Sequence, residues 1–517
     1  QDLVFDTQEG EHWPGGVFRV SVTGEDWGAG ALQADRLDLE ALNQIGQRLP
    51  LSTSLRDLLT RVQPQGQVNQ LKATWQKTDE ALNYTAHGQV KQLFLRRDPL
   101  PESPLANLPG VQGAQLEFDV NQKSGKAHLQ VNNGSLTLPL GLDDPQLVLR
   151  EASVQLAWQR KADALVVQFT QGRVSNDDLM GEFSGQWKTG EGANRLPGVL
   201  DLTASIGRGQ VKQVYRYLPN TIPVDVRTYL REALRGGEAN KVSLRLRGDL
   251  QHMPFDDPKL GEFRVVAQVV DGQFAYVPPV PVKGKSASVL NWPALTQVNG
   301  ELVFDRSALH FKGRTQMASA PNVTWQKVEV HIPNLAEPVV NVVGEAKGPL
   351  QQVLDTVSKT ALNDLTGGVL SKSQAKGDAA YKLSLTLPIH QLDASKVQGS
   401  VVFSDNALQV IPGTPVLDHA KGTLQFTEQG FKLDALQAEL LGGHAAFSGG
   451  LSFAAHEDKS PLALKIQGEL TAKGLRQARE LGLVSRLADR ATGGAAYVAT
   501  VGLRRGQPEL HIRSDLK

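Results

Sequence analysis

The sequence predicts a mainly β protein built on one long antiparallel sheet with a few short helical caps. Apolar and polar residues alternate in roughly thirty short runs, the pattern of strands with one buried and one wet face. Turn clusters such as Asn132-Asn133-Gly134 and Asp143-Asp144-Pro145 separate these runs at intervals of roughly ten residues, as in a meander. Few segments carry apolar residues at helical spacing, so helices cannot cover so many strands.

The bulk composition excludes some classes of protein. The 517 residues carry 54 Lys and Arg against 54 Asp and Glu, which argues against a nucleic-acid partner because such proteins need a basic face. Cysteine is absent, which fits an oxidising compartment such as the periplasm. No apolar run reaches the roughly 18 residues of a membrane-spanning helix. Because the chain starts at Gln1 without methionine and ends directly after an alternating pattern, we expect an internal fragment.

The first 210 residues are predicted to form a cap and a meander. Residues 1–66 hold the first strands, around the turn Trp13-Pro14-Gly15-Gly16, and then a helical cap interrupted by Pro50. Residues 67–210 form a β-meander of strands and turns.

Residues 211–240 are predicted to form a central helical cap. Val211, Val214, Tyr215 and Leu218 make one apolar helix stripe, which Pro219 ends because proline cannot donate a backbone hydrogen bond. A second helix follows from Val226 to Leu234, and Gly236-Gly237 is predicted to stop it. In the next strand Val242, Leu244 and Leu246 alternate with Ser243, Arg245 and Arg247, which predicts a half-buried strand at the start of a β segment over 241–348.

The rest of the chain repeats this organisation. Further helical caps are predicted over 349–376 and 471–493, each followed by Gly-x-Ala-Ala-Tyr, at 377–381 and 493–497. Between them, 377–470 is predicted to form β-hairpins, and 494–517 begins another β segment. A finer module recurs with identical offsets at 300–311, 399–410 and 422–433, and in each copy it predicts a strand, a short turn and a returning strand.

A long sheet with one apolar face must cover that face. It can close as a barrel, stack as a sandwich or curl into a gutter. Lipid chains filling an apolar groove satisfy the same requirement, since burying each CH₂ group is worth about 0.8 kcal/mol. The residue pattern alone leaves these alternatives open.

Landmark residues within 211–311 carry a family resemblance. They are Tyr217-Leu218-Pro219, Leu230, Ala233, Leu234, Gly236, Gly237, Gly248, Leu250, Pro254, Phe255, Gly261, Phe263, Tyr276, Trp292 and Pro293. On these residues the chain resembles the YhdP branch of the AsmA-like family of Gram-negative envelope proteins. The chain departs from the family at Tyr229, in place of tryptophan, and at Met253, in place of an aromatic residue.

The resemblance implies a fold and a function. The fold is a long twisted antiparallel sheet curled into an open apolar groove, a repeating β-groove. The function is passive phospholipid transport across the periplasm between the inner and outer membranes, with no enzymatic step. Acyl chains would lie in the groove while head groups project through its open seam. Contacts with both membranes, and an N-terminal helix in the inner membrane, would lie outside this fragment.

The predicted groove wall is the set of inward apolar residues on alternating strand positions. It consists of Val242, Leu244, Leu246, Phe263, Val265, Val269, Leu302, Phe304, Leu383, Leu385, Val401 and Phe403. The alternative is that these residues form the closed core of a β-rich structural or adhesive protein. A glycan-acting enzyme is a third possibility, but the dispersed tryptophans offer no cluster for sugar stacking.

No catalytic, cofactor or metal site is predicted. The eleven histidines form neither HxH nor HExxH, and the phosphate-binding and nucleophile-elbow motifs are missing. Weaker candidates are an anion site at Gly207-Arg208-Gly209, calcium sites at Asp177-Asp178 and Asp256-Asp257, and lipid phosphate contacts by three arginines on one helix face. Those arginines are Arg227, Arg231 and Arg235. A plain turn, solvated turn acids and a solvated helix face are the respective alternatives.

Overall fold

The structure is a computed structural model of the chain. It describes residues 5–6, 12–13, 16–24, 28–46, 53–78, 82–97, 109–138, 142–161, 164–191, 195–278, 292–360, 362–365, 368–452, 462–504 and 507–515. Twenty-five strands form an antiparallel sheet that is not closed into a barrel, which confirms the mainly β prediction. The chain divides into two compact units, Gln1–Arg231 with Glu238–Ala267, and Glu232–Gly237 with Gln268–Lys517.

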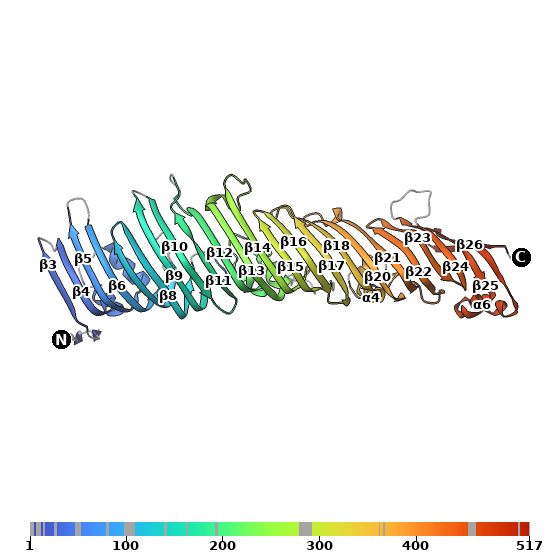
Figure 1. Ribbon diagram of the computed structural model, residues 1–517, viewed down its shortest axis with the longest axis horizontal. Helices are drawn as coiled ribbons and strands as arrows, with labels where there is room; N and C mark the ends of the chain where they lie inside the picture. Colours follow the sequence, from blue (N-terminus) through green and yellow to red (C-terminus); the bar gives the residue numbers. More distant parts are fainter. Residues whose placement is uncertain are drawn as a thin grey trace. The chain divides into compact units, whose positions relative to one another are not determined.

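In the first unit the pairing of strands follows the sequence, from β3 with β4 to β12 with β13 (Figure 1). The strands are β3 (Phe18–Thr23), β4 (Ala29–Asp38), β5 (Gln65–Lys77), β6 (Leu82–Leu95), β7 (Gly110–Asn121), β8 (Ser124–Thr137), β9 (Gln146–Lys161), β10 (Ala164–Ser175), β11 (Leu179–Lys188), β12 (Val199–Gln210), β13 (Leu234–Asp249) and β14 (Gly261–Phe274), of which the last two are shared with the second unit. A separate pair, β1 (Phe5–Asp6) and β2 (His12–Trp13), precedes them. In the predicted turn at 13–16, Pro14 and Gly15 lie outside the described residues.

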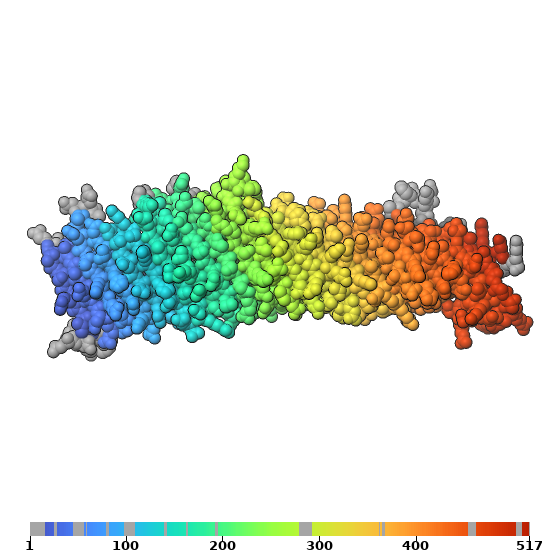
Figure 2. Space-filling view, viewed as in Figure 1, coloured from blue at the N-terminus to red at the C-terminus, as the bar shows by residue number. Residues whose placement is uncertain are grey.

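The second unit continues with strands of the same kind. They are β15 (Leu295–Asp305), β16 (Ala308–Met317), β17 (Ala320–Ile332), β18 (Val339–Pro349), β19 (Gln374–Lys376), β20 (Asp378–Pro388), β21 (Lys396–Gln409), β22 (Leu417–Thr427), β23 (Gly430–Leu440), β24 (Gly443–Ser452), β25 (Leu462–Thr471), β26 (Gly494–Arg504) and β27 (Gln507–Ser514). From the side shown in Figure 2, the atoms of neighbouring strands form an unbroken wall in each unit.

The helices lie in the four regions where the sequence predicts caps. They are α1 (Leu39–Gly46) and α2 (Thr53–Val62), then the 3₁₀ helix η2 (Val211–Tyr217) and α3 (Val224–Ala233), then α4 (Leu350–Lys359) and α5 (Leu362–Leu365), and finally α6 (Ala472–Gln477), η5 (Arg479–Leu481), α7 (Leu483–Leu487) and η6 (Ala488–Arg490). Single 3₁₀ turns, η3 (Leu250–His252) and η4 (Leu392–Ala394), occupy other connections.

In each unit the helical regions leave the sheet from one edge, which we call the capped edge of that unit. Successive antiparallel strands end at alternate edges, so β4 and β12 end at the same edge of the first unit. In the second unit β18 and β25 likewise end at one edge, where Figure 1 shows α4 and α6. Helix α4 packs there through Leu350 and Leu354, which share a helix face and join a buried cluster with Ala379 and Tyr381.

β-Bulges gather near the capped edge. Gln70, Gln92 and Gln171 have φ values of 53°, 52° and 50°, and the strand register shifts around each of them. His419 and Ala435 take the same conformation in the second unit. A bulge adds a residue to one strand, bends it and increases its twist. The sheet is therefore bent at the edge where the helices attach.

The central cap differs from its prediction in two ways. Val211–Tyr217 is a 3₁₀ helix rather than an α-helix, which fits a segment that reaches Pro219 within two turns. The predicted stop at Gly236-Gly237 is wrong, because α3 ends at Ala233 and β13 begins at Leu234. Gly237 instead has φ of 101°, and a β-carbon there would lie 2.5 Å from the Cα of Gly272. Glycine is needed at this position because the backbone of β14 lies too close for a side chain.

The predicted hairpin at 399–410 is also wrong, whereas its counterparts at 300–311 and 422–433 are hairpins. Strand β21 runs through the Ser404–Ala407 stretch without turning, because Asn406 converts it into a bulge. The amide of this fully buried residue donates to the carbonyls of Lys376 and Asp378, both at 3.2 Å. Its oxygen accepts the backbone N–H of Ser404 at 3.1 Å.

Candidate functional site

The candidate site is the inner face of the sheet, defined as the face that carries the buried apolar residues. Its rows can be followed through the strand register. Phe118 pairs with Ala127, Ala127 with Leu156, and Leu156 with Phe169, so one apolar row crosses four strands. The adjacent row on the other face pairs Glu117 with His128. Between the bulges, alternation therefore separates an apolar inner face from a mainly polar outer face.

All twelve predicted wall residues lie at inner-face positions of their strands. In the first unit Val242 pairs with Ile206, Leu244 with Ala204 and Leu246 with Leu202. In the second unit Leu302 pairs with Phe311, Leu383 with Gly399 and Val401 with Leu424. Val242, Leu246 and Phe403 are buried and the other nine are half-buried. Contact of these residues with lipid stays a prediction.

Burial of the inner face decreases with distance from the capped edge along several strands. Near the capped edge of the first unit, Ala114 and Val131 are 0% exposed. Farther along the same strands, Leu116, Phe118 and Leu129 are only half-buried. The second unit repeats the gradient along β20, where Ala379 and Tyr381 are buried and Leu383, Leu385 and Leu387 are half-buried. A sandwich core would bury the strand centres most completely, so the inner face keeps accessible apolar surface where a closed core would have none.

Ion pairs organise the outer face. The Arg245 guanidinium hydrogen-bonds the carboxylate of Asp201 and lies 3.8 Å from Glu262, which places it opposite to Leu244. The hydrogen bond from Arg245 lowers the pKa of Asp201 below its usual range. In the second unit Lys327 and Lys382 flank Glu345 across neighbouring strands, at 3.4 and 3.6 Å. Such exposed pairs contribute little to stability, but they make this face polar.

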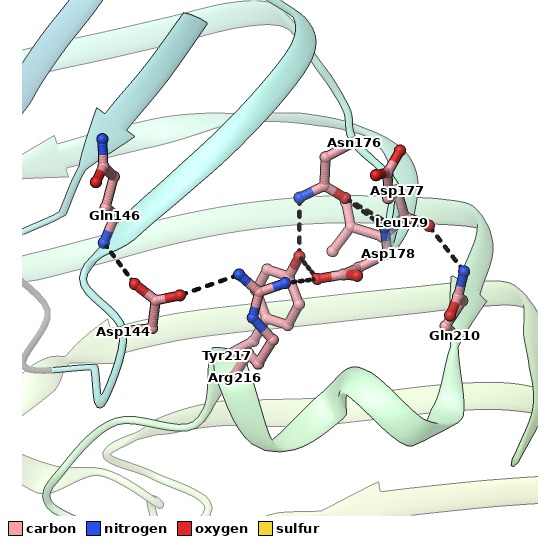
Figure 3. Close-up of polar contacts among 9 residues, drawn as sticks. All are labelled: Asp144, Gln146, Asn176, Asp177, Asp178, Leu179, Gln210, Arg216 and Tyr217. Carbon is pink, nitrogen blue, oxygen red and sulfur yellow. Dashed lines mark hydrogen bonds and ion pairs between the residues drawn. The ribbon is translucent and has the colours of Figure 1, made fainter.

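A polar network fastens the central cap to two turns of the first unit (Figure 3). Arg216 pairs with the buried carboxylate of Asp178 at 2.5 Å and with Asp144 at 3.1 Å. The Tyr217 hydroxyl donates to Asp178 at 3.0 Å and accepts from the Asn176 amide at 2.9 Å. The network therefore joins η2 to the β8–β9 and β10–β11 connections. Tyr217, the tyrosine of the Tyr217-Leu218-Pro219 motif, thus holds the central cap against the β10–β11 connection.

Burial changes the chemistry of this tyrosine. Tyr217 is half-buried, and loss of hydration raises its pKa to about 12, with the hydrogen bond and charge of Asp178 acting in the same direction. The phenol keeps its proton well beyond physiological pH and donates it to Asp178.

The structure gives several of the weaker candidate residues other settings than those predicted. Gly207-Arg208-Gly209 lies within strand β12, not at a helix N-terminus. The carboxylate of Asp178 is engaged by Arg216, while Asp177 pairs with Arg150 at 2.6 Å. The three arginines do not share a helix, since Arg235 belongs to β13. Among the described residues, no group of three His, Cys, Asp or Glu side chains is placed to hold a metal ion.

The twelve predicted residues leave out the inner face of the meander. Leu116, Phe118, Leu129, Leu156 and Phe169 occupy equivalent positions and are half-buried. The same period-two alternation marks them in the sequence, so this signal could have identified them. None of the helices in the described ranges is long and apolar enough to cross a membrane.

Comparison with known proteins places the chain in a family. The family described as "YhdP protein" matches residues 1–517. Among curated proteins, the "Intermembrane phospholipid transporter YhdP" of Escherichia coli (strain K12) is 24% identical over 447 residues. That match covers 84% of this chain and 33% of the relative, so the chain spans about a third of the relative's length. No solved structure matches. With the family match extending over every residue, the chain belongs to the YhdP protein family.

Proposed function

We propose that this chain carries phospholipid, with the acyl chains lying along the inner face. The observation that carries the proposal is the half-buried apolar surface beyond the capped edge, at residues such as Leu244 and Leu383. Transfer of acyl chains from water to such a surface is favourable by about 0.8 kcal/mol per CH₂ group. The printed name of the E. coli relative supports phospholipid as the ligand.

The proposal extends to mechanism and place. Head groups would stay outside the apolar surface, in water, because burying an unpaired charge is costly. The route makes and breaks no covalent bond, so we propose a passive carrier rather than an enzyme. By family membership we infer that it works in the periplasm between the two membranes. Both membranes would be contacted through regions outside these 517 residues, including an N-terminal helix in the inner membrane.

Photo-cross-linking tests this function with matched positions on the two faces. A benzophenone amino acid replaces Leu244 or its outer-face neighbour Arg245 in the first unit, and Leu383 or Lys382 in the second. Cells producing the full protein are labelled with radioactive phosphate and irradiated. We expect labelled phospholipid on positions 244 and 383 and little on 245 and 382.

Two outcomes would contradict the proposal. Silence at both inner positions in a folded protein would indicate that the inner face is a closed core, as in the structural or adhesive alternative. Equal labelling of the inner and outer positions would indicate non-specific contact with membrane rather than a route along the inner face.

A further inference from the structure

Aromatic rings on the inner face lie opposite glycines on neighbouring strands. Trp158 pairs directly with Gly125, Phe183 with Gly172, and Phe426 with Gly399. Three more direct pairs of this kind are Gly30–Trp75, Gly88–Phe118 and Gly185–Phe169. The arrangement therefore recurs along the first unit and is present in the second.

At Gly125 and Gly172 the ring occupies the place of the side chain that the glycine lacks. A β-carbon added to Gly125 would lie 2.3, 2.6 and 2.8 Å from three ring atoms of Trp158, with no other atom as close. At Gly172 the corresponding distances to the Phe183 ring are 2.6, 2.7 and 2.7 Å. Carbon atoms in contact are normally at least about 3.5 Å apart, so an alanine could not share the space with the ring.

The backbone does not require glycine at these positions. Neither Gly125 nor Gly172 has φ in the left-handed region, and the same holds for Gly344, where the Trp325 ring would lie 2.8 Å from an added β-carbon. Alanine would fit the strand conformation better than glycine, which is disfavoured inside strands. The ring is therefore what accounts for the glycine.

We propose that these glycine–aromatic pairs hold the rings against the sheet and thereby set the depth of apolar space available to acyl chains. The inference rests on the proposed lipid-carrying function. A ring displaced from its glycine must rotate away from the sheet, over the inner face. Rings are the largest apolar side chains, so a single displaced ring would obstruct chains lying along that face. Sheet stabilisation by a ring that covers a glycine is the alternative role.

A glycine-to-alanine substitution, with and without removal of the ring, tests the inference. The full protein is incubated in membranes containing a phospholipid with a diazirine on its acyl chain, irradiated, and digested for mass spectrometry. We expect Gly125→Ala to reduce labelling of peptides from β8–β10 several-fold. The double variant Gly125→Ala/Trp158→Leu should restore it, and Trp158→Leu alone should keep it.

Two further sets of variants serve as control and replicate. Gly207→Ala should label as the wild type does, because a β-carbon there would come no closer than 4.0 Å to another residue, at the carbonyl oxygen of Met180. Gly344→Ala, with and without Trp325→Leu, repeats the test in the second unit and decides the question if Gly125→Ala does not fold. Circular dichroism and the thermal midpoint report folding.

The outcomes separate this inference from the proposed function. A wild-type protein without label on inner-face peptides would overturn the proposed function itself. A labelled wild type with undiminished labelling of folded Gly125→Ala would overturn only the role of the pairs. Loss of label that persists in the double variant would also overturn it, since the methyl group rather than the ring would then be responsible. Loss of label in Trp158→Leu alone would indicate the stabilising role.

Discussion

The capped edge and the strand centres bury the same apolar face to different extents. Near the capped edge, helices and bulged strands enclose Val131 and Leu149 almost completely. At the strand centres Leu129 and Phe118 keep part of their surface exposed. The comparison separates two tasks along one strand. The buried residues near the capped edge contribute folding stability, while under the proposed function the half-buried residues at the strand centres offer apolar surface to acyl chains.

The largest expected effect is a difference between two leucines of adjacent strands. Leu149, 2% exposed, lies in the buried cluster near the capped edge, whereas Leu129 is half-buried. We expect Leu149→Ala to lower the free energy of unfolding by about 3 kcal/mol, because it leaves a cavity. Leu129→Ala should cost about 1 kcal/mol, since less area returns to water. Urea unfolding of both variants measures the difference, and equal losses would mean that the strand centres are core in the same way as the capped edge.

Sequence patterns predict the faces of this sheet well because alternation is a local property. The separation of Leu244 from Arg245 follows from a period of two, and the ion pair between Arg245 and Asp201 agrees with it. The same pattern cannot predict what depends on register. Asn406 looks like a turn residue, yet it hydrogen-bonds Lys376 of β19 and Asp378 of β20, which lie 30 and 28 positions earlier in the sequence.

Bulges and ring–glycine contacts also depend on strand register, so a local sequence pattern cannot predict them. Gln70 and Gln92 have no compositional mark of left-handed backbone, and only strand pairing shows why they adopt it. Gly125 and Trp158 are separated by 33 positions in the numbering, and nothing in the sequence near either indicates the other. The sequence could therefore predict which residues lie on the inner face, but not the shape of that face.

A second pair of variants compares a polar residue at the capped edge with one at the opposite edge. Asn406 at the capped edge is fully buried and makes three hydrogen bonds to backbone. We expect Asn406→Ala to cost about 2 kcal/mol, since two carbonyls and one N–H lose a partner away from water. The matched control Asn334→Ala removes one hydrogen bond, to the N–H of Ala336, in an exposed connection at the opposite edge. It should cost about 0.5 kcal/mol or less, and a comparable loss in both variants would contradict the assignment of stability to the capped edge.

The smallest expected effect concerns the central cap. Tyr217→Phe removes the hydroxyl that accepts from Asn176 and donates to Asp178, while Arg216 still pairs with Asp178. We expect a loss of about 1 kcal/mol at neutral pH, the usual worth of a hydrogen bond whose partners keep other contacts. Tyr84→Phe, at an exposed side chain, is the matched control and should leave the free energy of unfolding unchanged.

The pH dependence of Tyr217→Phe tests whether burial of this hydroxyl matters. The pKa of Tyr217 is raised to about 12 in the folded protein, above the ordinary value of about 10. The unfolded chain therefore ionises first, and the contribution of Tyr217 to stability, complete below pH of about 10, is lost as the pH rises towards 12. Urea unfolding across this range should show a shallower decline for Tyr217→Phe than for the wild type. If the free energy of unfolding declined equally in both proteins, the phenol would be hydrated in the folded protein. The network of Figure 3 would then leave the Tyr217 hydroxyl open to water.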